Sequence, residues 1–231
     1  MEKLIKAYPN VKWIGHRGLA SKILENTNES FLAAARLPFF GIETDIHFTL
    51  DHIAVTHHDD NLKRLSNYDY IINKTPHHVL ETVKLKSKYH IPLFSEYLKI
   101  CKLYKKFAVI ELKASFDTKQ IRQIIDQINE LSYLDQVIII SFIPSNLVHL
   151  RKLYPNIKLQ FLTDKFNNEI INLAAMYRFD LSLHHSIVTK PIVDTIHKLN
   201  LEIGVWTVNS LPKAIELIHM GIDYITTDGI E

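Results

Sequence analysis

Two carboxylates lie two residues apart in the segment between Gly41 and Asp59, which has the pattern of two short strands. Successive side chains of a strand point to opposite faces, so Glu43 and Asp45 share one face. Neighbouring carboxylates are costly to hold together without a compensating cation. The second strand-like run delivers His58 at its end. Carboxylates and an imidazole that arrive together at strand ends indicate a site, although this segment alone is also consistent with a polar strand facing solvent.

Other residues capable of chemistry follow two further strand-like runs. His16 and Arg17 come after the first run of the chain, in a tight turn bracketed by glycines. Glu111 and Lys113 are two residues apart in a later run and therefore also share one face. If these runs are parallel strands of one barrel, their carboxyl ends meet at the rim where barrel enzymes place catalytic groups. That rim would hold three carboxylates, two histidines, an arginine and a lysine.

This combination of residues suits the cleavage of a phosphate ester. Glu43, Asp45 and Glu111 supply only oxygen ligands, which fit Mg²⁺ or Ca²⁺ better than zinc. With such an ion, Arg17 and Lys113 would attract a phosphate group rather than a neutral one. The ion would polarise a phosphoryl oxygen as a Lewis acid.

The two histidines complete the predicted chemistry. His16 and His58, on opposite sides of a phosphate, can act as general base and general acid. His57 should face the other way from His58 and be structural, since neighbours in a strand alternate. Asp228 is expected to close the barrel end rather than to bind metal. The alternative role for Lys113 is that of a Schiff-base lysine. The surrounding carboxylates disfavour this role because they keep the Lys113 ammonium group protonated.

Strand-like and helix-like runs alternate along most of the chain and predict an α/β fold, a TIM (β/α)8 barrel. The competing topology is an open doubly wound sheet, but no Gly-x-Gly-x-x-Gly motif follows any predicted strand. Between the strands, amphipathic patterns such as that of 118–131 predict helices. The expected strands are 11–14, 41–47, 107–113, 136–142, 158–162, 180–183, 201–208 and 222–227, with 53–56 as an extension or partner of the second.

Two departures from a regular barrel are expected. Residues 60–90 follow no period and indicate an insertion after the second strand, with a short helix near 76–81, that covers the site as a lid. The sequence ends at Glu231, too soon after the last strand for a full helix, so the last helix should be missing or truncated.

Composition sets the class of protein. A chain of 231 residues suits a single barrel domain spanning 1–231. Lys and Arg number 27 against 25 Asp and Glu, a balance that gives no support for a nucleic-acid partner. Cys101 is the only cysteine, so no internal disulfide can form. With no signal-peptide pattern and no run approaching the ~20 apolar residues of an integral membrane segment, the expected location is cytoplasmic.

A series of short motifs runs in order along the chain: Gly15-His16-Arg17-Gly18, Glu25-Asn26-Thr27, Glu43-Thr44-Asp45-Ile46, Thr49-Leu50-Asp51, His58-Asp59, Glu111-Leu112-Lys113, Val205-Trp206-Thr207-Val208-Asn209, Gly221-Ile222-Asp223 and Thr227-Asp228. These ordered motifs resemble those of the glycerophosphodiester phosphodiesterase family over essentially the whole chain. The resemblance implies a TIM barrel, a divalent metal (Mg²⁺ or Ca²⁺), and hydrolysis of small-molecule glycerophosphodiesters to glycerol 3-phosphate and an alcohol.

Roles follow from the resemblance position by position. His16 and His58 match the family's acid–base pair. Trp206 matches the aromatic residue on the glycerol side, and Glu25 matches a supporting acid. The remaining matches are Glu43, Asp45 and Glu111 as metal ligands, and Arg17 and Lys113 as phosphate contacts.

The sequence departs from the family pattern at places away from this chemistry. Leu24 stands where the family usually has Pro, so the loop should be looser and the chemistry intact. His52 stands where Gly is usual, which should alter the turn between the two strands. The proline common after Thr-Asp is also missing at the end of the chain.

Two other functions are consistent with these residues. One is a phosphodiesterase directed at phospholipids or lysophospholipids, with an apolar rim that the insertion would supply. A different class is a phosphate-binding barrel without turnover, which the intact set of histidines and carboxylates argues against. The oligomeric state is not readable, and a homo-oligomer is left open as a partner. The residues that would form the apolar rim are Tyr68, Tyr70, Ile71 and Ile72.

Overall fold

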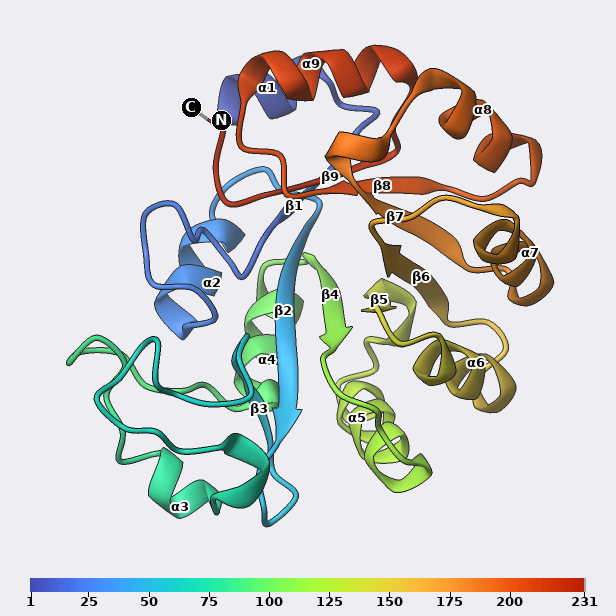
Figure 1. Ribbon diagram of the computed structural model, residues 1–231. Coiled ribbons are helices and arrows are strands. Elements are labelled where there is room, and N and C mark those ends of the chain that lie inside the picture. The colour runs from blue at the N-terminus through green and yellow to red at the C-terminus, as the bar shows by residue number, and fades with distance from the viewer. Residues whose placement is uncertain (231) are drawn as a thin grey trace.

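The predicted barrel is present in the computed structural model, which describes residues 1–230 (Figure 1). Eight parallel strands form a closed ring, because the first strand pairs with both the second and the last. The (β/α)8 prediction is therefore confirmed and the open sheet is excluded. The strands are β1 (Lys12–Gly15), β2 (Gly41–Phe48), β4 (Phe107–Leu112), β5 (Val137–Ser141), β6 (Lys158–Thr163), β7 (Asp180–His184), β8 (Ile203–Trp206) and β9 (Tyr224–Thr227).

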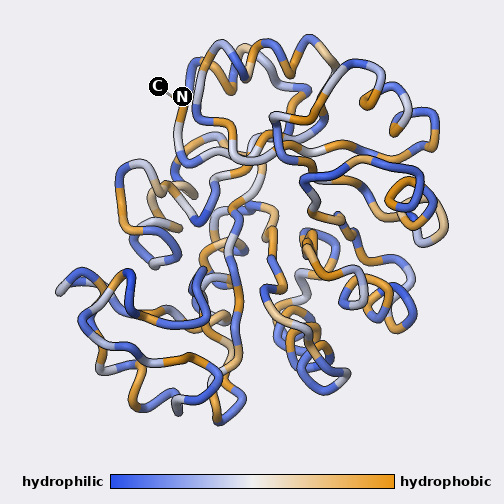
Figure 2. The backbone as a smooth tube through the Cα atoms, in the orientation of Figure 1, coloured by the Kyte–Doolittle hydropathy of each residue, from blue (hydrophilic) through white to orange (hydrophobic). Residues whose placement is uncertain are grey.

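Helices surround the barrel, and α2, α5 and α7 begin at a side-chain cap. The side chain of Thr27 accepts a hydrogen bond from the Ser30 amide at the start of α2, and Asp117 caps α5 in the same way through the Gln120 amide. Hydrophobic residues recur along the strands and helices, and hydrophilic ones along the loops (Figure 2). The helices are α1 (Glu2–Ala7), α2 (Asn28–Ala35), α4 (Phe94–Leu103), α5 (Thr118–Glu130), α6 (Pro144–Leu153), α7 (Asn168–Tyr177), α8 (Lys190–Lys198) and α9 (Leu211–Met220), with short 3₁₀ turns at Leu134–Gln136 and His185–Ile187.

An ionic layer closes the barrel at the amino ends of its strands. Glu202 pairs with both Lys12 and Lys158, and the hydroxyl of Tyr224 donates to the same carboxylate over 2.7 Å. Lys158 also lies 3.8 Å from Asp180. These charged groups neutralise one another at the amino ends of the strands, where the side chains of Lys12, Lys158 and Glu202 are about one-third exposed.

The insertion after β2 is a small unit beside the barrel and does not cover the cavity at its carboxyl rim. The short strand β3 (Ala54–Thr56) pairs antiparallel with β2, and the expected helix near 76–81 is α3 (His77–Leu80), preceded by a 3₁₀ turn at Ile72–Lys74. No residue lining the cavity comes from 60–90. The lid expectation is wrong for the cavity because the insertion's apolar residues pack against one another: Val55, Leu62, Leu65, Ile72, Leu80, Val83, Leu85 and Ile91.

No helix follows β9 among residues 228–230. The amino-terminal segment packs against this end of the barrel. Ile5 of α1 joins the main core, and the side chain of Met1 faces Gly229. His52 adopts φ 61°, the left-handed region that favours glycine, so the turn is kept despite the departure from the family residue.

Candidate active site

The candidate site is a cavity of about 230 Å³ at the carboxyl rim of the barrel. Strands β1, β2 and β4 place their functional groups along one side of it, and β8 contributes an aromatic side chain. Seven of the nine predicted site residues line this cavity; Asp45 and Glu25 lie directly beside it. The lining residues are Ile14, His16, Arg17, Glu43, His58, Val109, Glu111, Lys113, Ile140, Phe142, Gln160, Leu162, Ser182, Trp206, Thr207 and Thr226.

Three carboxylates form a buried cluster at the centre of the site. The register of β2 against β4 sets Asp45 opposite Glu111, and the candidate ligand oxygens of Glu43, Asp45 and Glu111 lie within 4.8 Å of one another. All three residues are at least nine-tenths buried. Glu43 Oε1 is buried without a hydrogen-bond donor, and the buried Asp45 Oδ1 forms no hydrogen bond, although Lys113 Nζ lies 3.4 Å from it. Such orphaned oxygens fit a hard divalent cation, which would complete their coordination.

The electrostatics of the cluster also favour a bound cation. Burial raises the pKa of Glu43 well above its usual value, and the charges of Asp45 and Glu111 raise it further. Burial and Asp45 likewise raise the pKa of Glu111 to about 7. Burial alone would raise the pKa of Asp45 too, but Arg17 and Lys113 hold it below its usual value. The positive charges of Arg17 and Lys113 therefore do not fully compensate the three carboxylates of the cluster.

Two cations flank the carboxylates. The Arg17 Nε lies 3.3 Å from Asp45 Oδ2, and its main-chain amide donates to Glu43 Oε2 over 2.9 Å. Lys113 Nζ lies 3.0 Å from Glu111 Oε1 and 3.4 Å from Asp45 Oδ1. Carboxylates thus hold both cations at the cavity wall, where an anionic group in the cavity can reach them.

Each predicted catalytic histidine is oriented by its own carboxylate. His16 Nδ1–H donates to Asp228 over 2.7 Å, and His58 Nδ1–H donates to Asp59 over the same distance. These bonds leave Nε2 of each ring free for proton transfer. Burial lowers the pKa of His58 although Asp45 opposes the shift, so this ring is mainly neutral at neutral pH.

The orienting carboxylates and their supports are the functional residues that sequence reasoning missed. Asp228 does not bind the cluster, as expected, but its bond to His16 was not predicted. Asn26 is buried and donates to Asp45 Oδ2 over 2.8 Å, which fixes that carboxylate. Arg64, from the insertion, donates to Asp59 over 2.6 Å. The Asp59 partner was visible as the neighbour of His58, whereas the contact between Asp228 and His16 joins residues 212 positions apart.

Glu25 lies beside the cavity and joins the two arginines of this region. It accepts hydrogen bonds from Arg17 over 2.9 Å and from Arg64 over 2.6 Å. Thr27 donates to the main-chain oxygen of Leu24 over 2.7 Å, so the loop is tied down without the family's proline. This loop holds the Arg17 side chain toward Asp45.

Aromatic residues form the opposite wall. Trp206 Nε1–H donates to the main-chain oxygen of Ser182 over 3.0 Å, which fixes the indole. Its ring packs edge-on against the rings of Phe142 and His184, with ring centroids 5.2 and 5.0 Å apart, respectively. Phe142 is 43% exposed at the mouth. The apolar rim expected from the insertion does not form part of this cavity: Tyr68 and Ile71 are exposed and Ile72 is buried, but none of these residues lines the cavity, and neither does Tyr70.

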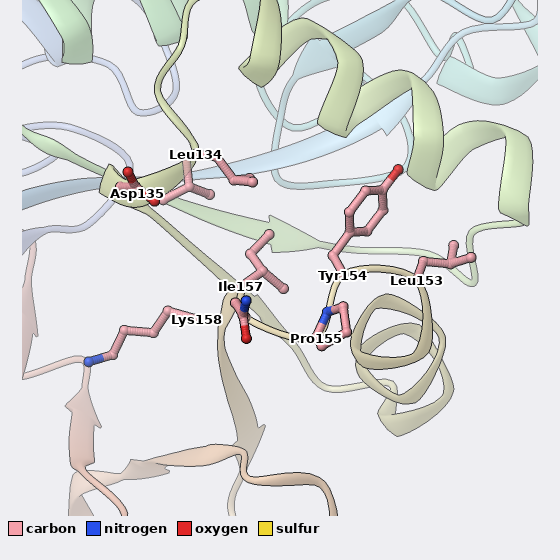
Figure 3. Close-up of a pocket in the computed structure, with 9 residues that line it drawn as sticks. Leu134, Asp135, Leu153, Tyr154, Pro155, Ile157 and Lys158 are labelled. Atoms are coloured by element: carbon pink, nitrogen blue, oxygen red, sulfur yellow. The ribbon is translucent and has the colours of Figure 1, made fainter.

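Two neighbouring features are not part of this cavity. His57 is buried, and its Nε2–H donates to the main-chain oxygen of Asn61 over 3.2 Å, in keeping with the predicted structural role. A second hollow of about 370 Å³ lies where the chain enters β5 and β6, bordered by Leu134, Tyr154 and Lys158 (Figure 3). It contains none of the residues predicted to do chemistry.

The barrel and this rim of carboxylates, histidines and cations define a hydrolase of phosphate esters. Residues 16–231 match the model of the glycerophosphoryl diester phosphodiesterase family, and the chain belongs to this family of phosphoric diester hydrolases. A glycerophosphodiester phosphodiesterase of Bacillus altitudinis is 29% identical over 94% of each chain. No helix among residues 1–230 is both long and apolar enough to cross a membrane.

Solved structures agree with this assignment of the fold. The crystal structure of a glycerophosphodiester phosphodiesterase from Thermotoga maritima is 27% identical, covers 94% of each chain and has a TM-score of 0.76. An Oleispira antarctica phosphodiesterase, solved with the product sn-glycerol-3-phosphate, is 24% identical, covers 96% of this chain and 95% of its own, and has a TM-score of 0.83.

Proposed function

We propose that this enzyme is a divalent-cation-dependent phosphodiesterase that hydrolyses glycerophosphodiesters to glycerol 3-phosphate and an alcohol. The observation that carries the proposal is the buried cluster of three carboxylates, with orphaned oxygens, between two histidines that each donate to a carboxylate. Glu43, Asp45 and Glu111 would hold Mg²⁺ or Ca²⁺, and the bound ion would polarise a phosphoryl oxygen.

The chain's own residues bind the phosphate and move the protons. Arg17 and Lys113 contact the phosphoryl oxygens from the wall of the cavity. One of His16 and His58 removes a proton from the attacking hydroxyl through Nε2, and the other protonates the leaving alcohol. Asp228 and Asp59 hold Nδ1–H of both rings, so the base is the neutral ring, whose Nε2 accepts the proton, and the acid is the imidazolium ring, whose Nε2–H is given to the leaving alcohol.

The attacking group is either water or a hydroxyl of the substrate's own glycerol. The second route gives a cyclic phosphate that water then opens. The side chains named above serve both routes, since each needs one base and one acid. Trapping a cyclic glycerol phosphate during turnover selects the second route, and direct incorporation of water-derived oxygen without that intermediate selects the first.

Trp206 is proposed to pack against the glycerol arm, and Glu25 to hold Arg17 in place. A second candidate activity is hydrolysis of lysophospholipids, which the 43% exposure of Phe142 at the cavity mouth favours because an acyl chain could cover that ring. A single domain spanning 1–231, a cytoplasmic location and a homo-oligomer remain predictions.

The test is a substrate panel assayed with purified protein and with Mg²⁺ or Ca²⁺ added. Release of glycerol 3-phosphate from glycerophosphocholine and glycerophosphoethanolamine is the expected result. Faster turnover of a lysophospholipid would select the second activity. Binding of glycerol phosphate without turnover of any diester would instead identify a phosphate-binding barrel.

A further inference from the structure

Gln160 lies inside the barrel, below the carboxylate cluster. It is in the middle of β6, two residues after Lys158 of the ionic layer and two residues before Leu162 of the cavity wall. Side chains two apart in a strand share a face, so Gln160 points into the barrel between these two levels. The residue is 2% exposed and lines the same cavity as His16 and Glu111.

The amide of Gln160 has no partner in the described chain. Its Nε2 is buried and donates no hydrogen bond. The neighbouring residues Ile140 and Leu162 are apolar and cannot accept one. Asp180 pairs with Gln160 in the register of β6 against β7, but its carboxylate accepts from the Glu202 main-chain amide and forms no hydrogen bond to the Gln160 amide. The ionic layer below is occupied by its own pairs, since Glu202 already accepts from two lysines and a tyrosine. Because native proteins pair nearly all buried donors, this amide indicates a partner that the chain itself does not supply.

Two hydroxyls line the cavity together with this amide. Among residues 1–230, neither the Ser182 side chain nor the Thr226 side chain forms a hydrogen bond to the protein. Gln offers two donors and an acceptor, and each hydroxyl can donate or accept. Val109 and Ile14 add apolar surface to the same space. Hydroxyl-binding groups beside apolar walls match a short polyol, whose carbon chain is apolar and whose oxygens need partners.

We propose that Gln160 is a specificity-determining residue that donates a hydrogen bond to a hydroxyl of the substrate's glycerol arm; the proposal rests on the proposed phosphodiesterase function. A phosphate bound at the carboxylates leaves two directions for the ester arms. One leads to the inner end of the cavity, between Gln160 and the ionic layer, and the other to the open rim. The inner end has room for a short arm, and its polar groups recognise hydroxyls. The glycerol arm therefore points inward and the alcohol arm outward.

The test compares two ligands that differ only in hydroxyl groups. Binding of sn-glycerol 3-phosphate and of n-propyl phosphate is measured by calorimetry with the full chain, in whichever of Mg²⁺ or Ca²⁺ supports hydrolysis. The wild-type protein should prefer glycerol 3-phosphate by about tenfold or more, the discrimination of one buried hydrogen bond. Gln160→Met should lower this preference by about tenfold, the loss of one buried hydrogen bond, and leave the affinity for n-propyl phosphate unchanged. The control Gln127→Met, on the outer helix α5, should retain the preference.

Each result decides the matter. A preference retained in Gln160→Met overturns the inference and leaves the amide paired with an ordered water. Equal loss of affinity for both ligands also overturns it, because the residue would then be structural. If Gln160→Met does not fold, Gln160→Leu takes its place with the same expectation. Hydrolysis of glycerophosphocholine by the wild-type protein is measured in parallel. Failure of hydrolysis and of both bindings rejects the proposed function together with the inference, whereas hydrolysis with an unchanged preference rejects the inference alone.

Discussion

Replacing Glu111 by Gln should stabilise the metal-free protein and abolish its stabilisation by metal. The wild-type cluster places three carboxylates in a buried site, and burial and Asp45 raise the pKa of Glu111 to about 7 from the model-compound value of 4.5. The folded protein therefore binds this proton more tightly than the unfolded chain does. Stability falls as the pH rises from about 4.5 through about 7, where Glu111 ionises in the fold.

The size of the effect follows from the two pKa values. A shift from 4.5 to about 7 corresponds to about 3 kcal/mol of unfolding free energy once the group is ionised, near pH 8. At pH 5 Glu111 lowers the free energy of unfolding by less than about 1 kcal/mol, because it is still protonated in the folded protein. Glu111→Gln should thus exceed the wild-type protein in stability by about 3 kcal/mol at pH 8 and by little at pH 5.

Urea unfolding in the presence of EDTA at both pH values measures this difference. Saturating Mg²⁺ or Ca²⁺ should then raise the stability of the wild-type protein and leave that of Glu111→Gln nearly unchanged. Glu130→Gln, at an exposed position of α5, is the matched control and should show neither effect. Equal or lower stability of Glu111→Gln at pH 8 without metal would refute the reasoning that the carboxylates repel one another.

Further predictions concern the histidines and the residues that orient them. His16→Ala and His58→Ala should each lower kcat by roughly 10²–10⁴-fold with an unchanged circular dichroism spectrum; near-normal rates in both would contradict the acid–base assignment. Asp228→Asn should lower kcat less than His16→Ala does and keep the metal-induced stabilisation, because it removes only the acceptor that orients the ring; an unchanged kcat would show that the ring does not need it. Arg64→Ala should lower kcat with little change in KM, whereas Lys63→Ala, at a neighbouring surface ion pair, should change neither; matching kinetics in the two variants would rule out a positioning role for Arg64.

Local pattern was sufficient to predict the elements and much of the cluster. The spacing of Glu43 and Asp45, and that of Glu111 and Lys113, follows from the two-residue period of strands. Because the carboxyl ends of the strands in a parallel barrel share one rim, the sequence also predicted that these two pairs of residues lie close together. The register that sets Asp45 opposite Glu111 could not be predicted, because it depends on pairing between strands that are more than sixty residues apart.

The missed residues depend on closure of the barrel and on packing of the insertion. Asp228 reaches His16 only because β9 pairs with β1 at the end of the ring. Arg64 reaches Asp59 because the insertion folds on its own core and not over the cavity. The unpaired amide of Gln160 is likewise a property of the closed interior, since nothing in the local sequence of β6 distinguishes it from an ordinary polar residue.

The central claim is that the buried carboxylates hold the divalent cation on which phosphodiester hydrolysis depends. The most direct measurement is the rate of glycerol 3-phosphate release from glycerophosphocholine by protein stripped with EDTA, before and after Mg²⁺ or Ca²⁺ is restored. We predict no release from the stripped protein, recovery with one of these ions, and no recovery in Glu43→Gln at the same ion concentration. Full activity of the stripped, metal-free protein would contradict the account.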